Sequence, residues 1–454
     1  MKALKYFVLG CLSVGFLISC KSFLAEDINV DPNKPSNVPV SAMLPNIEIR
    51  VVDVYGGDTS RFNSMLSQQV EGVARQWTSF NNYSGLTPNR FDTAWDNYYE
   101  NILVEVNNMI AAADDLGYSH YSGIGKVLKG FALMNMTDCW GNVPYFQAAV
   151  LYPNASDAEL ILSPEIDSRS AIYDEVLSLI NEGESALNGG NGGLAVGSDD
   201  VIYGGDIAKW LDAVKAIKAR YYLHKGDYAQ AASNARDAFE SPEDNMSYTY
   251  SASQQAGWWR FNDGRTGDIE FHPFLRDLMT DLGDTARLAI LDQTFITSHP
   301  YHKADYEQDL VSYREMQFII AESLQRTGGS AADIAEAYGR GIAASFFEVG
   351  ATEADLNAYV NNPNVALDGT AGDLKKILTQ KYLGLYTHPE VFNDLRRNDY
   401  PDLGIDSSFS PTSGSLMPQR WNYPGDELLF NQNFADQIGS ATLFSPAPAW
   451  GSGL

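Results

Sequence analysis

Apolar residues recur at helical spacing along most of the chain, and this periodicity predicts its architecture. Between residues 96 and 114 one apolar stripe has the period of an α-helix with a single buried face. The stripe consists of Tyr98, Tyr99, Ile102, Leu103, Val106, Met109, Ile110 and Ala113. A second amphipathic helix is predicted over 122–137, and Gly117 lies in the turn between the two, so together they form a helical hairpin.

The same periodicity predicts further helices, whereas no comparable set of segments alternates between apolar and polar residues as half-buried strands do. These helices are expected at 169–187, 207–224, 228–239, 311–327, 331–347, 352–361 and 373–385. The pattern therefore predicts an all-α fold. Residues 188–200, 241–268 and 407–454 are predicted as irregular loops. The last two hold aromatic residues among Gly, Asn, Asp and Pro, a composition typical of loops that form binding surfaces.

One segment, 209–238, has the signature of a tetratricopeptide helix pair. Trp210 opens the first helix, Gly226 allows the sharp turn, and small alanines in the second helix permit close packing. A second such pair is expected at 313–347. Any antiparallel pair of helices would give a similar pattern, and this alternative stays open.

The first twenty residues have the features of a signal peptide. Lys2 and Lys5 precede an apolar run over 6–18, which is too short to cross a bilayer as a helix. Small residues then lead to Cys20, as in a lipobox, so we expect cleavage after residue 19 and a lipid anchor on Cys20. The alternative is an ordinary secretory signal with an incidental cysteine. The expected organisation is a signal peptide at 1–19, a lipidated tether and turn at 20–40, and a single domain at 41–454.

Charge and cysteine content narrow the possible functions. The 454 residues include 58 acidic and 31 basic side chains, a net charge of −27, which makes nucleic acid an unsuitable partner. Ligands are expected to be neutral, cationic, or recognised by ring stacking. Of the three cysteines, Cys11 leaves with the signal and Cys20 carries lipid, so Cys139 has no partner for a disulfide.

Six segments, in order, resemble the SusD/RagB-like outer-membrane nutrient-binding lipoproteins, and most closely their SusD-like branch, the starch-binding type associated with the outer membrane. Together they span nearly the whole chain. They are the lipobox; Asn29 to Asn33; Ala94 to Tyr99; Lys126 to Phe131 with Asp138 to Tyr145; Lys381 to Leu385 with Phe392 to Arg397; and Pro418 to Pro424 with Glu427 and Asn431. The Trp140 to Tyr145 and Asp394 to Arg397 elements are specific in combination.

The resemblance implies a right-handed superhelix of about four tetratricopeptide pairs with a loop-rich part that carries the ligand site. It also implies a SusC-like TonB-dependent transporter as partner, an oligosaccharide or peptide as ligand, no cofactor, and an outer-membrane location. Two departures are present. Asp284 and Arg287 are separated by Thr285-Ala286, where the family often has Asp-Pro-Arg, and residues 21–25 separate Cys20 from the first acidic residues. The second departure leaves open whether the protein faces the cell exterior or the periplasm.

Two clusters combine aromatic rings, which can stack on a sugar, with polar groups, which can bind its hydroxyls. The predicted ligand-binding residues are Trp77, Phe80, Asn81, Asn82, Tyr83, Trp258, Trp259, Arg260, Asn262 and Asp263. The alternative for each cluster is that its rings pack beneath loops as small cores. Packing is the role expected of Trp95, Trp140, Trp210 and Trp421, which lie in the elements shared with the family.

Other chemical motifs are weak. Arg396 and Arg397 near Asp394 are expected to form a buried ion-pair cluster, not an anion site. His299 and His302 have metal-like spacing, but Pro300 interrupts the helix that would align them. The alternating Asp and Asn residues over 27–38 lack the glycine and glutamate of a calcium loop.

Three function classes therefore remain. Nutrient binding is favoured, and a helical scaffold that binds peptides is the alternative from another class. A glycoside hydrolase needs two facing carboxylates, and with 58 acidic residues in the chain the sequence does not exclude such a pair. The local signatures of serine hydrolases, dinucleotide and phosphate sites and zinc proteases are missing from the sequence.

Overall fold

The computed structural model describes residues 38–148, 161, 163–293, 299–405, 416–438 and 441–445. The predicted signal peptide, the lipidation at Cys20, most of the tether and the rejected calcium-like spacing lie outside the described residues.

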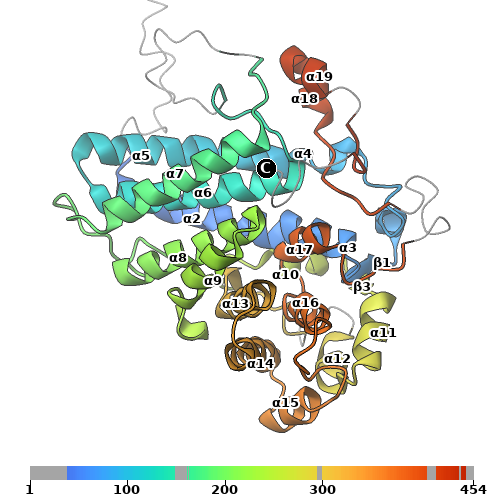
Figure 1. Ribbon diagram of the computed structural model, residues 1–454. Helices are drawn as coiled ribbons and strands as arrows, with labels where there is room; N and C mark the ends of the chain where they lie inside the picture. The colour runs from blue at the N-terminus through green and yellow to red at the C-terminus, as the bar shows by residue number, and fades with distance from the viewer. Residues whose placement is uncertain are drawn as a thin grey trace, which may run out of the picture.

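Helices dominate the described structure (Figure 1), so the predicted all-α architecture is confirmed. The α-helices are α2 (Val40–Val54), α3 (Ser60–Leu66), α4 (Asp92–Asp96), α5 (Val104–Leu116), α6 (Ser119–Trp140), α7 (Arg169–Leu187), α8 (Ile207–Lys225), α9 (Tyr228–Arg236), α10 (Gly257–Gly264), α11 (Pro273–Asp281), α12 (Thr285–Leu291), α13 (Tyr313–Thr327), α14 (Ala331–Glu348), α15 (Glu353–Val360), α16 (Asp373–Gly384), α17 (Glu390–Asn398), α18 (Gly425–Phe430) and α19 (Gln432–Ile438).

Shorter elements connect these helices. Two are π-helical, η2 (Tyr55–Thr59) and η5 (Asn97–Leu103), and three are 3-10 helices, η3 (Arg75–Phe80), η4 (Pro88–Arg90) and η6 (Pro242–Asp244). The strands are β1 (Val70–Gly72), β2 (Met246–Thr249), β3 (Ile269–Phe271) and β4 (Glu307–Val311). They form two small antiparallel sheets, β1 with β3 and β2 with β4.

The periodicity located most helices within a few residues. The predicted helix 169–187 matches α7 in full, and those from 207 to 385 correspond to α8, α9 and α13 to α16. The predicted helix 96–114 is interrupted, because its first part is the π-helical η5. The loop predictions for 241–268 and 407–454 are wrong where α10, α18 and α19 lie.

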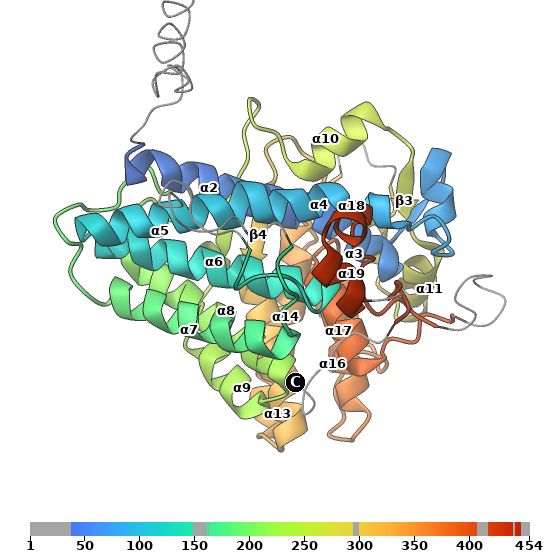
Figure 2. The same cartoon turned by 90° about the horizontal axis from the view of Figure 1, so that it is seen from above.

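The helices pack in sequence order as an array. Each of α2, α5, α6, α7, α8, α9, α13 and α14 contacts the next, and the first five lie side by side when seen from above (Figure 2). The predicted pair α8 and α9 turns at Gly226, whose φ of 75° suits glycine. Ala231 and Ala235 of α9 are fully buried, as close packing requires. In the pair α13 and α14, Gly341 leaves room for the ring of Phe318.

The core is continuous through this array, and the four tryptophans predicted to pack are all buried in it. Trp95, Trp140 and Trp421 contact one another through their rings, with centroids 5.1 Å and 4.9 Å apart along the series. Trp210 donates from Nε1 to Asp200, 2.8 Å away. Among the described helices, none is long and apolar enough to cross a membrane.

Candidate ligand-binding site

The fold brings the two predicted clusters together. The first follows β1 and the second, on α10, precedes β3; these strands pair, with Val70 opposite Phe271. The Trp77 ring packs edge-on against Phe261 of α10, with centroids 4.9 Å apart. Two segments far apart in the sequence therefore form one region of the surface, as the sequence alone could not show.

Four of the predicted stacking rings are buried. Trp77, Phe80, Tyr83 and Trp258 have exposed fractions of 7%, 1%, 3% and 2%. The Trp258 Nε1 donates to the Ser60 hydroxyl, 2.8 Å away. A buried ring has no free face for a sugar, so in this structure these four rings take the packing role that the sequence left as an alternative.

Two polar residues of the clusters, Asn81 and Asn262, form hydrogen bonds within the protein. The side-chain oxygen of Asn81 accepts a hydrogen bond from the Gly72 N–H at 2.7 Å, and its Nδ2 donates to the Gly72 carbonyl at 2.8 Å. These two bonds fix the loop. Asn262 is buried, and its Nδ2 lies 2.6 Å from His302 Nδ1.

The remaining predicted residues are accessible. Arg260 and Asp263 are exposed, and Asn82 and Trp259 are half-buried. Ligand contact at these four positions stays a prediction.

A pocket with a volume of about 330 Å³ opens beside Arg260. Its walls come from α2, η2, α3, α4, η5 and α10, which meet at this point of the fold. The lining residues are Arg50, Asp53, Val54, Gly57, Asp58, Arg61, Ala94, Asn97, Gly257, Arg260 and Phe261. Only Arg260 was predicted from the sequence; a possible signal for the others was the Gly56-Gly57-Asp58 run within a helical segment.

Both π-helical segments contribute to the pocket, and glycines allow α10 to lie close to η2. A Cβ atom on Gly257 would come within 2.8 Å of the Gly57 Cα, and one on Gly56 within 2.4 Å of the Gln308 side chain. A Cβ on Gly57, by contrast, would meet nothing within 4 Å. Wide π-helical turns inside helices occur frequently at functional sites, because they displace side chains from the regular helical face.

Arginine–aspartate pairs organise the polar side of the pocket. Arg260 lies 2.9 Å from the Asp53 carboxylate, which also accepts a hydrogen bond from Tyr250 at 2.7 Å. Arg61 pairs with Asp58, and its guanidinium lies 4.7 Å from the centroid of the Phe261 ring. Such pairs present donors and acceptors in fixed directions, as recognition of sugar hydroxyls requires.

The Arg61 guanidinium carries a buried charge. Burial lowers its pKa from the ordinary value, Asp58 opposes that shift, and the positive charges of Arg260 and Arg265 add to the lowering. Arginine stays protonated in proteins despite such shifts, so the pocket holds a cation with little water around it.

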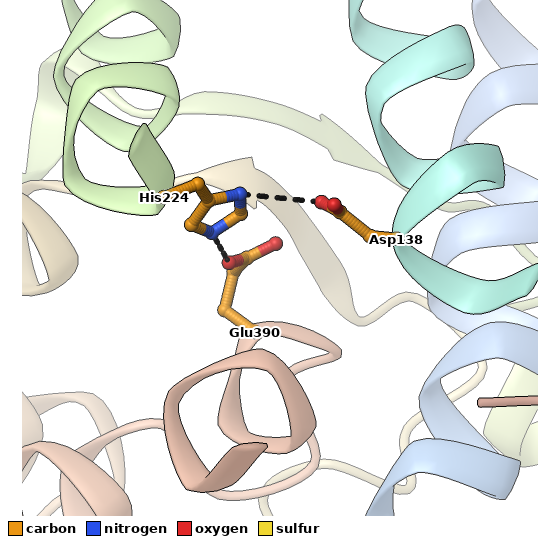
Figure 3. Close-up of side chains that lie close together, drawn as sticks. All are labelled: Asp138, His224 and Glu390. Atoms are coloured by element: carbon orange, nitrogen blue, oxygen red, sulfur yellow. Dashed lines mark hydrogen bonds and ion pairs between the residues drawn. The ribbon is translucent and has the colours of Figure 1, made fainter. Parts of the chain in front are cut away.

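A buried group elsewhere has the composition of a metal site. Asp138, His224 and Glu390 converge from α6, α8 and α17 (Figure 3). His224 Nε2 lies 2.8 Å from Glu390 and Nδ1 lies 3.3 Å from Asp138. Although burial lowers the pKa of His224, the two carboxylates outweigh it and raise that pKa. Asp138 also pairs with Arg169 at 2.8 Å, and Glu390 lies 3.8 Å from Arg220, so these residues fit an ion-pair cluster better than a metal centre.

The predicted arginine cluster is confirmed for Arg397. It bonds Glu322 at 2.8 Å and Asp394 at 2.7 Å, and Lys381 lies 2.8 Å from Asp394. Burial would raise the pKa of Glu322, but Arg397 and Lys381 hold it well below its usual range. Arg396 differs from the expectation, because it donates to backbone carbonyls of Asp138 and Gln419, both at 2.8 Å.

The two histidines with metal-like spacing are buried side by side. The ring centroids of His299 and His302 are 4.7 Å apart, and His299 Nε2 lies 3.2 Å from the carbonyl of Leu291. Burial lowers the pKa of His299 to about 4. These rings therefore support the segment beneath α10, where His302 also packs against Trp258.

Comparison with known proteins places these features in context. A SusD-like family model described as starch-binding associating with outer membrane matches residues 32–299 and 286–424. No curated protein sequence matches the chain.

Solved structures share the fold at low sequence identity. A SusD/RagB family protein from Bacteroides thetaiotaomicron is 18% identical with a TM-score of 0.71, over 90% of this chain and 98% of that one. A SusD homologue from Bacteroides fragilis is 19% identical with a TM-score of 0.71, over 90% and 99%. A chitin-binding protein is 22% identical with a TM-score of 0.69, over 88% and 96%.

Proposed function

Because the chain belongs to the SusD-like family of starch-binding proteins associated with the outer membrane, we propose that it is a lipid-anchored nutrient-binding protein that captures an oligosaccharide. Its binding site is the pocket between α2, η5 and α10, together with the accessible residues of α10. Members of this family bind ligands rather than transform them, and the proposed role involves no covalent chemistry.

The pocket is the observation that carries this proposal. Its walls combine two arginine–aspartate pairs with the amide of Asn97 and the half-buried ring of Phe261. Hydroxyl groups need paired donors and acceptors, and the apolar face of a sugar needs a ring edge or face. Trp259 and Asp263 extend the site along α10.

The rest of the role follows from the sequence and the family. The lipobox ending at Cys20 supports cleavage after residue 19, a lipidated tether over 20–40 and a single binding domain over 41–454. The family resemblance supports delivery of the ligand to a SusC-like TonB-dependent transporter and display at the cell surface.

Calorimetric titration of the purified full-length protein with oligosaccharide and peptide libraries tests the proposal. We expect saturable binding of oligosaccharides, with no new products detected by chromatography. Arg260→Ala and Asn97→Ala should each weaken binding at least about tenfold, because each removes a polar group of the pocket. Lys225→Ala, on α8 away from the pocket, should leave affinity unchanged.

The possible failures have different meanings. Product formation would indicate a hydrolase. Selective binding of peptides would favour a RagB-like peptide-binding protein or a helical scaffold. Undiminished oligosaccharide binding by both pocket variants would place the site elsewhere on the protein.

A further inference from the structure

The balance of charge in the pocket is opposite to that of the whole chain. Three arginines, Arg50, Arg61 and Arg260, line it together with two aspartates, Asp53 and Asp58. Each aspartate pairs with one of the arginines, at α10 and at α3. One positive charge is left over, although the chain as a whole carries −27.

Arg50 is the residue that carries the extra charge. It is exposed on α2, one turn before Val54, and within the described part of the chain no acidic group lies within ion-pair distance of it. Arg265 adds a further positive charge close to Arg61, as its effect on the pKa of Arg61 indicates.

Arg61 has an unused hydrogen-bond donor. Its side chain is only 11% exposed, and its Nε is buried with no acceptor among the described residues. The other guanidinium nitrogens are engaged, one by Asp58 and one by the carbonyl of Gly257 at 3.4 Å. Leaving a buried donor without an acceptor is unfavourable, so the described residues do not fully satisfy the Arg61 guanidinium.

Building on the proposed function, we propose that this pocket binds the oxyanion of an acidic sugar residue, either the carboxylate of a uronic acid or a sulfate ester. Arginine suits both groups, because its planar fork donates two parallel hydrogen bonds to two oxygens. Arg50 supplies the uncompensated charge, and Arg61 adds a second cation at the pocket wall. The neighbouring arginine–aspartate pairs bind the hydroxyl groups of the same sugar unit.

The negative charge of the whole molecule does not prevent this binding. Charges further apart than about 8 Å are largely screened at physiological ionic strength. Inside the pocket the ligand therefore responds mainly to the adjacent charged groups, and the field of Arg61 is the least screened because its side chain is only 11% exposed.

Matched neutral and acidic glycans test the inference on the full-length protein. We would titrate it with oligogalacturonides and their methyl esters, with glucuronoxylan and unsubstituted xylan fragments, and with sulfated galactan fragments and the same fragments after desulfation. Acidic members should bind at least about tenfold more tightly than their neutral counterparts, which corresponds to about 1.4 kcal/mol. Preference for the sulfated or for the carboxylated members identifies which oxyanion is the natural one.

Two substitutions connect the preference to the pocket. Arg50→Gln should reduce the affinity for acidic members about tenfold more than the affinity for neutral members, because only the acidic members use its charge. Gly57→Ala should lower the affinity for every ligand, because its methyl group would occupy open space in the pocket without clashing with the protein. The matched controls are Lys225→Gln, which removes one charge from α8, and Gly339→Ala, whose Cβ also meets nothing within 4 Å. Neither control should change affinity.

The outcomes separate the inference from the proposed function. If neutral glycans bind as tightly as acidic ones, or if Arg50→Gln leaves the preference intact, the oxyanion site is refuted while oligosaccharide binding stands. If no glycan of either kind binds, both are refuted.

Discussion

Trp258 anchors α10 to the core. Its ring is buried, its Nε1 bonds the Ser60 hydroxyl on α3, and that hydroxyl donates to the carbonyl of Thr387. The ring thus connects the pocket wall to two other parts of the core. Trp259, the next residue, is half-buried at the surface.

Substitution of these neighbouring tryptophans should therefore have different effects. Trp258→Ala should lower the free energy of unfolding by about 3–5 kcal/mol, because it leaves a cavity in the core. Trp259→Ala should change stability less and ligand affinity more. Denaturant unfolding and calorimetric titration of both variants check this; equal loss of stability in the two would contradict the assignment of roles.

Buried neutral histidines should make the protein sensitive to acid. His299 lies among the rings of Tyr301, His302 and Tyr386, and burial lowers its pKa from 6.5 to about 4. As the pH falls, His299 of the unfolded chain is protonated near pH 6.5, before His299 of the folded protein. The stability contributed by the neutral form is therefore complete above pH 6.5 and is lost as the pH falls towards 4.

The melting temperature measured between pH 7 and pH 4.5 checks this expectation. His299→Gln, which cannot be protonated, should be less stable at pH 7 but should lose less stability on acidification than the parent protein. Identical slopes for the two proteins would show that His299 does not titrate in this range.

At the residue scale, the sequence identified side chains that pack in the core but, apart from Arg260, not those that form the pocket. Trp95 and Trp140 were assigned to packing because they lie in elements shared with the family. Trp77 and Trp258 lie in short irregular contexts, where composition does not reveal which side of a ring faces water. Arg50 and Arg61 were not singled out, since their role depends on α10, which is distant in sequence.

At the scale of elements, the close contact between α10 and η2 shapes the pocket. Gly257 and Gly57 meet backbone to backbone, so no side chain separates the two elements. Gly257→Ala should push α10 outward, because its Cβ would lie 2.8 Å from the Gly57 Cα.

We expect Gly257→Ala to lower both the melting temperature and ligand affinity. Gly264→Ala, at the other end of α10, is the matched control, since its Cβ meets nothing within 4 Å. Thermal unfolding and titration of the two variants distinguish them. Equal melting temperatures and equal affinities in the two variants would mean that the close contact between Gly257 and Gly57 is unimportant.

The elements that periodicity missed have identifiable reasons. Residues 257–264 form a helix of two turns that begins and ends with glycine, too short and too rich in glycine to show a periodic stripe. The helix Val40–Val54 contains Pro45, which normally argues against a helix interior. The π-helical turn Asn97–Leu103 departs from the regular spacing on which the prediction rested.

At the scale of the whole molecule, buried ion pairs hold the helical array together. Arg220 of α8 bonds Glu315 of α13 at 2.6 Å, and His224 joins α8 to α6 and α17. Such networks are visible only once the helices are placed. The family resemblance predicted the helical fold correctly, because its motifs lie in the scaffold.

The proposed membrane attachment depends on the sulfur atom of Cys20. Cys20→Ser should release the protein from the membrane fraction into the soluble fraction of cells, because the acyl chains attach to the cysteine sulfur. Fractionation followed by immunoblotting checks this, with Cys139→Ser as the control for loss of a thiol that carries no lipid. Continued sedimentation of the Cys20→Ser variant with membranes would contradict lipid anchoring.

The most direct test of the account is a crystal structure of the protein with the oligosaccharide that binds most tightly in titration. We predict an intact sugar chain with one unit in the pocket, in contact with Arg61 and Arg260 and extending along α10 past Trp259. A sugar bound on another face, or a chain cleaved at the site, would contradict it.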